Sequence, residues 1–207
     1  IVGISKLEVE NSFINYFDKD TEIYKGMKLI DNKLGGTTPL DIIIKFPDRE
    51  KSEKTDDDFD NWDDEEKDEA KYWFTRNKIN IITKVHDYLD NLQEVGKVIS
   101  FASMVRVAED LNDGKELRGL EMGILYTQIP DSIKKEIIDP YISIKNNEAR
   151  ISLRILDSKE DLRRNELIKK INYDLENQLG LNREEFKLAG ILILFNNLLQ
   201  SLFKSQI

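Results

Sequence analysis

The stretch PLDIIIKF, residues 39–46, decides the fold. Apolar side chains at positions 40, 42, 44 and 46 alternate with Asp41, Ile43 and Lys45. A period of two places successive side chains on opposite faces of a β-strand. We therefore expect a strand here, with one strongly apolar face.

The segment before this strand, residues 5–34, has the period of a helix. Ile23, Met27, Ile30 and Leu34 recur at spacings of three or four residues and should lie on one helix face. The pair Gly35-Gly36 follows directly and predicts the end of this helix.

The segment after the strand predicts a helix over about 75–92, followed by a short strand at 95–101. The apolar residues expected on the buried face of this helix are Ile79, Ile82, Val85, Leu89 and Leu92. A helical insertion, residues 102–138, comes next. On its first helix the apolar face is expected to be Met104, Val107, Ala108 and Leu111.

The last third of the chain repeats the strand–helix–strand order. Ile151, Leu153 and Ile155 alternate with polar residues and indicate a strand, and Ser158 with Asp161 resembles a capping box. The helix that follows should bury Ile168, Ile171, Leu175 and Leu179 and end at Gly180. Residues 184–194 are predicted as a fourth strand, central in the sheet because it is apolar on both faces.

Two strand–helix–strand units in series predict an α+β fold, a ferredoxin-like βαββαβ sandwich with helical insertions. We expect a single domain over residues 1–207. Its parts are an N-terminal helical segment (1–36), an α+β core (38–194) with an acidic insertion (48–69) and the helical insertion (102–138), and a connector (195–207). Leu198, Leu199, Leu202 and Phe203 predict that the connector is a helix with a partly exposed apolar stripe.

Charge is distributed very unevenly along the chain. Residues 48–69 hold thirteen acidic and four basic residues, so their net charge of −9 equals that of the whole protein. Such a run is typical of a solvated loop, and we expect residues 50–60 to be mobile or to extend from the surface. The acidic balance argues against a nucleic-acid partner, which needs clustered cations. The chain has no cysteine, so disulfides are excluded.

Four segments resemble the RND superfamily of exporters, in the branch that contains the MMPL and hopanoid-exporter proteins. They are YFDKDTEIYKGMKLIDNKLGGTTPLDIII (16–44), NKINIITKVHDYLDNLQEVGKVISFASMVRVAEDLN (77–112), NEARISLRI (147–155) and LAGILILFNNLLQSLFKSQI (188–207). They occur in the order of the family's first extracytoplasmic loop, and only the acidic insertion departs from the pattern.

The resemblance implies a periplasmic porter domain of a proton-driven exporter of lipidic or hydrophobic substrates, at the inner membrane. Its partners would be the transmembrane helices and second porter loop of the same protein, and a homo-oligomer is possible.

The chain begins with Ile1, and we expect it to be a piece of a longer protein. The longest apolar run, residues 188–195, falls well short of the roughly 20 residues of a membrane helix. The family's proton-relay carboxylates lie in membrane helices, so we expect no pumping by this piece alone. The alternative is a free-standing extracytoplasmic binding or assembly module.

We expect no enzyme activity, no catalytic residue and no cofactor, because no acid–base pair or nucleophile constellation stands out. The alternating carboxylates from Asp56 to Asp64 suggest at most weak divalent binding, since Asn61 and Lys67 replace the glycine and glutamate of an EF-hand loop. His86, the only histidine, has no ligand partner at metal-site spacing. Four aromatic residues around the insertion could line a path for an apolar substrate or anchor the insertion to the core: Trp62, Tyr72, Trp73 and Phe74.

Overall fold

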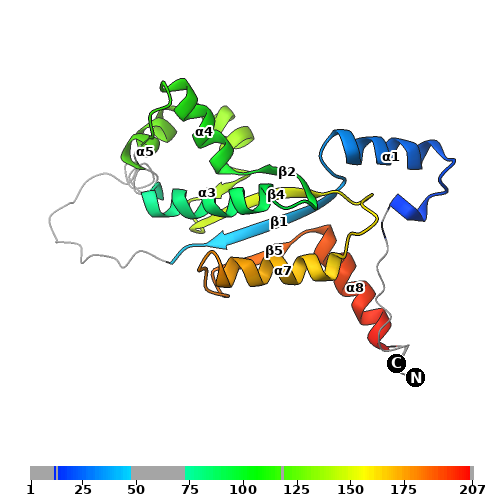
Figure 1. The fold of residues 1–207 in the computed structure, drawn as a ribbon. Coiled ribbons are helices and arrows are strands. Elements are labelled where there is room, and N and C mark those ends of the chain that lie inside the picture. The colour runs from blue at the N-terminus through cyan, green and yellow to red at the C-terminus, as the bar shows by residue number, and fades with distance from the viewer. Residues whose placement is uncertain (1–11, 13, 48–72, 118, 206–207) are drawn as a thin grey trace.

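The computed structural model describes residues 12, 14–47, 73–117 and 119–205, and in this part of the chain the fold is α+β. Seven α-helices accompany a five-stranded sheet (Figure 1). The helices are α1 (Glu22–Lys33), α3 (Arg76–Asp90), α4 (Phe101–Leu111), α5 (Gly119–Gln128), α6 (Asp131–Ile133), α7 (Arg164–Asn177) and α8 (Ile191–Ser205). The strands are β1 (Thr38–Lys45), β2 (Val95–Ile99), β3 (Ile142–Ser143), β4 (Glu148–Ile155) and β5 (Phe186–Ala189). A 3-10 turn η2 (Ile14–Tyr16) precedes α1, and a π-helical turn η3 (Lys134–Ile138) follows α6.

The strands lie in the order β2-β4-β1-β5, and β3 adds to β4. Each of these pairings is antiparallel. Strand β1 is central: Ile42 lies opposite Ile151 of β4 on one side and Leu188 of β5 on the other. The sheet is open, with β2 and β5 at the two ends of this order.

One face of the sheet forms the core with helices α3 and α7. Leu40, Ile42 and Ile44 of β1 are almost fully buried on this face, together with alternate residues of β4. The two helices are joined where the Tyr88 hydroxyl donates to Asp174 Oδ2 at 2.6 Å. Burial and this bond raise the pKa of Tyr88. The other face of β1 carries Asp41 and Ile43, which stay partly exposed.

The structure confirms the predicted strands at β1 and β4 and the predicted helices at α3 and α7. The alternating face of residues 40–46 is buried, as is the stripe of α3 at Ile82, Val85 and Leu89. Helix α1 ends where the glycine pair predicts it, with Gly35 at φ 79° and Gly36 at φ 97°. Gly180 likewise follows α7 with φ 73°. Helices that the sequence marks by a sustained apolar period and a following glycine therefore end where the sequence predicts.

The prediction of a central fourth strand over 184–194 was wrong. Strand β5 covers only residues 186–189 and lies at the end of the strand order. Gly190 has φ 112°, and its Cα faces the β1 backbone so closely that a Cβ would lie 3.2 Å from Pro39 O. The chain turns there and continues as α8, so the apolar run is divided between an edge strand and a helix.

Three predictions about helix faces and ends were also wrong. The N-terminal helix is confined to residues 22–33 among those described, and Ile23, Ile30 and Leu34 of its expected apolar face are exposed. Helix α4 buries Phe101, Ala102 and Val105, whereas Val107 and Leu111 face solvent. No capping box starts α7 at Ser158, because the helix begins six residues later. An apolar stripe fixes the phase of a helix, but neighbouring elements decide whether that stripe is covered.

Replacing Gly36 with alanine should destabilise the fold by about 1–3 kcal/mol, because a positive φ strains a residue that carries a Cβ. That Cβ would also lie only 2.6 Å from the carbonyl oxygen of Ile155. Gly26, inside α1 with no neighbour within 4 Å, is the matched control. Gly26→Ala should stabilise by up to about 1 kcal/mol. Urea unfolding of both variants measures the difference, and equal effects would contradict the contact at Gly36.

Candidate functional site

The aromatic residues predicted beside the acidic insertion divide into two groups. Trp62 and Tyr72 lie outside the described residues. Trp73 and Phe74 are buried in the core, which favours the anchoring role for these two over a substrate path. Trp73 makes edge contacts with Phe46 (centroids 5.9 Å apart) and with Phe74 (5.2 Å). Phe74 in turn packs against Phe101 and Tyr126.

Polar contacts reinforce this cluster at the two described flanks of the insertion. The Asn147 side-chain amide donates to the carbonyl oxygens of Phe46 (3.1 Å) and Pro47 (2.9 Å). Lys78 Nζ donates to Asn147 Oδ1 at 2.6 Å and lies 4.6 Å from the Trp73 ring centroid. Asn147 and Lys78 therefore hold the residues before the insertion, Phe46 and Pro47, close to Trp73, which follows it, at the end of β1.

Replacing Asn147 with alanine should cost about 1–3 kcal/mol of stability, because it removes these bonds and leaves carbonyl acceptors and Lys78 without this partner. Asn147 has φ 53°, so Asn147→Gly is the control that removes the side chain without backbone strain. Thermal melts should show both variants destabilised, alanine more than glycine. A glycine variant as stable as the wild type would contradict the role of the amide.

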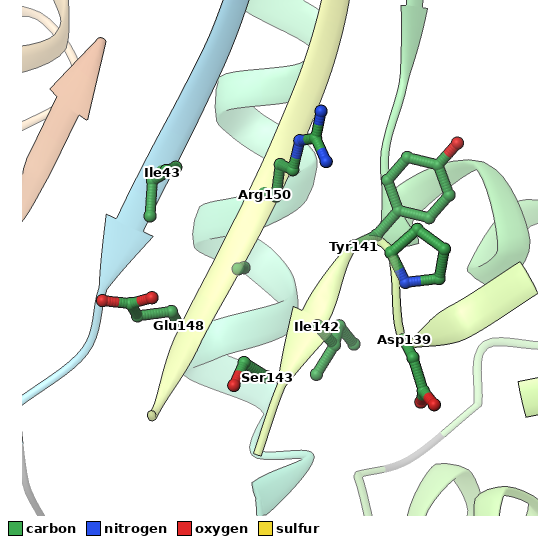
Figure 2. Close-up of a pocket in the computed structure, with 9 residues that line it drawn as sticks. Ile43, Asp139, Tyr141, Ile142, Ser143, Glu148 and Arg150 are labelled. Carbon is green, nitrogen blue, oxygen red and sulfur yellow. The ribbon is translucent and has the colours of Figure 1, made fainter. Parts of the chain in front are cut away.

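A shallow cavity of about 170 Å³ opens on the face of the sheet opposite α3. Figure 2 shows Ile43 of β1 and Arg150 of β4 on one side of it, and Tyr141 and Ile142 on the other. Arg150 pairs with Asp41 at 2.8 Å across the strands. The surface of the cavity is mainly apolar, and its lining residues include Asp139, Glu148 and Arg150. It holds no paired nucleophile and base within the described residues that line it.

His86 is a structural residue in this fold. Its ring is buried, and Nδ1 lies 2.9 Å from the hydroxyl oxygen of Ser100. Ser100 is also the N-cap of α4, where its side chain accepts from the Ala102 N–H at 3.1 Å. Burial, followed by the nearby Arg106 charge, lowers the pKa of His86. This pair joins α3 to the start of α4. Because both side chains are buried, neither can contact a substrate at the surface in this structure.

No group of three or more His, Asp or Glu in the described part of the chain could hold a metal ion. The alternating carboxylates at 56–64 lie outside those residues, so the weak divalent site stays a prediction.

Helix α8 carries an exposed apolar stripe. Ile191, Leu194, Leu198 and Leu202 follow one another at helical spacing, and each is more than half exposed. The opposite side of the helix holds buried Leu192 and Asn196, and Phe195 contacts Tyr16 at 6.3 Å between ring centroids. The predicted helix at the connector is therefore confirmed over residues 195–205, with its stripe exposed at Leu198 and Leu202. Among the residues described, no helix is long and apolar enough to cross a membrane.

A buried polar cluster, missed from sequence, lies at the opposite end of α1 from its N-cap. Asp31 is the only buried residue of α1, and it accepts from the backbone N–H groups of Asp157 (3.0 Å) and Ser158 (2.9 Å). Asp157 pairs with Arg164, and both side chains are almost completely buried. Ser12 Oγ also donates to Asp157 Oδ2 at 2.7 Å. These contacts fix α1 against the loop of residues 156–163.

No protein-family model, curated protein or solved structure matches this chain.

Proposed function

We propose that this chain is a periplasmic porter domain of a proton-driven RND-type exporter of lipidic or hydrophobic substrates. It would lie on the extracytoplasmic side of the inner membrane, beside the transmembrane helices and second porter loop of the same protein. The four ordered segments that resemble this family support the proposal. The domain would shape part of the substrate path, while the proton gradient acts elsewhere in the protein.

The strand order supports a ferredoxin-like arrangement for this domain. Helix α3 lies in the chain between β1 and β2, and in the sheet β4 lies between those two strands. Helix α7 likewise follows β4 and precedes β5, with β1 between them in the sheet. Two interleaved crossovers of this kind are what a split βαβ sandwich requires.

The observation that carries the proposal is the exposed stripe of α8. Four large apolar side chains on one helix face are an energetic cost in water, and such patches are normally covered by a partner or a membrane. Strand β5 leads directly into this helix through Gly190. This is where the resemblance places the connection to the next membrane helix, so we assign the stripe to that contact.

The test measures export of a fluorescent apolar dye from cells that express the full gene product. Leu198→Asp and Leu202→Asp should reduce export to background, whereas Val107→Asp, an equally exposed position on α4, should leave it unchanged. Dissipating the proton gradient should stop wild-type export. Thermal melts of the 207-residue chain should show all three variants folded. Continued export in both stripe variants would refute the proposal. Continued wild-type export after the proton gradient is dissipated would refute it as well.

A free-standing binding or assembly module is the second candidate. The exposed face of α1, with Ile23, Ile30 and Leu34, favours it, because a separate module would need an apolar surface for its partner. Cell fractionation separates the two functions. An exporter remains in the membrane fraction after a high-salt wash, whereas a free-standing module is released into the extracytoplasmic fluid.

A further inference from the structure

A second cavity, of about 180 Å³, lies between α1 and the loop of residues 156–163. It is separate from the sheet-face cavity and shares no lining residue with it. Its lining is mainly polar and comes from two stretches far apart in the sequence, residues 12–28 and residues 157–164.

The charged residues that line this cavity are mostly basic, whereas the chain outside the acidic insertion has no net charge. Among the described residues that line it, four are basic, Lys19, Lys28, Lys159 and Arg164, and two are acidic, Asp157 and Glu160. Asp157 is already neutralised by its buried pair with Arg164 and accepts from Ser12 Oγ as well. Among the described residues that line the cavity, the lysines are then opposed by Glu160, which is exposed. The buried carboxylate of Asp31, behind this wall, is already bonded to the backbone of Asp157 and Ser158.

The three lysines form no ion pair within the part of the chain that the structure describes. Lys159 Nζ reaches only the carbonyl oxygen of Gln93, at 3.4 Å. Lys28 Nζ lies 5.7 Å from the Tyr24 ring centroid. An anion in this cavity would give these ammonium groups a counter-charge and charge-assisted hydrogen bonds.

The walls of the cavity are held in place before any ligand arrives. Asp31, at the far end of α1, binds the backbone of Asp157 and Ser158, and Thr37 Oγ1 donates to the same carboxylate at 2.7 Å. Lys28 lies one turn before Asp31, so the same contacts position its helix against the loop that carries Lys159. A preorganised site loses less conformational entropy on binding.

We propose that this cavity binds a phosphate-type oxyanion, either free or as the headgroup of an anionic lipid. Three lysines and the Tyr24 hydroxyl supply several donors around a small volume, which suits a compact, multiply charged oxyanion better than a monovalent carboxylate. The site is independent of the exporter proposal, because it needs only the 207-residue chain.

The test is a calorimetric and NMR titration of the 207-residue chain with inorganic phosphate at low ionic strength. Binding should be saturable, should weaken as salt is raised, and should exceed acetate binding by at least about tenfold. The double variant Lys28→Gln/Lys159→Gln should weaken phosphate binding by at least about tenfold. Lys135→Gln, an exposed lysine that lines neither cavity, should leave it unchanged.

A second measurement distinguishes the two sources of the oxyanion. Sedimentation with phosphatidylcholine vesicles that contain phosphatidic acid, compared with phosphatidylcholine alone, tests the lipid headgroup. Co-sedimentation that depends on phosphatidic acid and on the two lysines assigns the site to a headgroup. Phosphate binding without co-sedimentation assigns it to a free anion. Equal phosphate responses in the double variant and in Lys135→Gln, or acetate binding as strong as phosphate binding, would overturn the proposal. Circular dichroism melts confirm that each variant is folded.

Discussion

Replacing Arg164 with leucine is expected to lower the free energy of unfolding by about 3–5 kcal/mol, because it leaves a buried carboxylate without its counter-charge. Asp157 is almost fully buried, and its other contacts, from Ser12 Oγ and the Ile14 N–H, are neutral donors. Neutral hydrogen bonds do not offset the cost of removing a charge from water. Chemical denaturation at neutral pH measures the loss.

Two controls separate this effect from simple loss of packing. The double variant Asp157→Asn/Arg164→Leu removes both charges and should be more stable than Arg164→Leu alone. Arg150→Leu breaks the partly exposed pair with Asp41 on the sheet and should cost at most about 1 kcal/mol. If Arg164→Leu cost no more than Arg150→Leu, the Asp157 carboxylate would not be buried as the structure has it.

The second large effect is expected in the apolar core. Leu175→Ala and Leu192→Ala should each cost about 2–5 kcal/mol, since both side chains are buried and truncation leaves a cavity. Leu194, two residues from Leu192 on the same helix, is mostly exposed. Leu194→Ala should therefore change stability by less than about 0.5 kcal/mol.

Urea unfolding of these three variants tests the phase of α8 directly. Losses below about 1 kcal/mol for both core variants would contradict the packing of α7 and α8 on the sheet. A loss at Leu194 as large as that at Leu192 would mean that the helix is rotated or that its stripe is covered within the chain.

Candidate functional residues were harder to predict than secondary structure. The sequence singled out Trp73 and Phe74 for either a substrate path or an anchor, and the structure places both side chains in the core. The lysines of the proposed oxyanion cavity lie at positions 19, 28 and 159, and no spacing in the sequence connects them. Their proximity depends on the contact between α1 and the loop of residues 156–163, which forms through Asp31.

The sequence by itself determined the elements whose local signals agree. Strand β1 follows from an alternation that no helix could bury on one face, and α7 follows from a sustained helical period ended by Gly180. In both segments the period, the length and the neighbouring turn residues favour the same structure. Tertiary contacts therefore did not change the secondary structure that these local signals favour.

Only the tertiary structure decided the segments whose local signals conflict or are silent. The run LAGILILF suits a buried strand or a helix equally, and the close approach of Gly190 to β1 divides it between the two. Helix α1 has a clear apolar stripe, yet its single buried residue is Asp31, because the contact that holds α1 is polar. Charged residues are expected at the surface from sequence alone. The burial of Asp31 becomes favourable because its carboxylate accepts from the backbone of Asp157 and Ser158, far along the chain. The burial of Arg164 becomes favourable because it pairs with the buried carboxylate of Asp157 on the preceding loop.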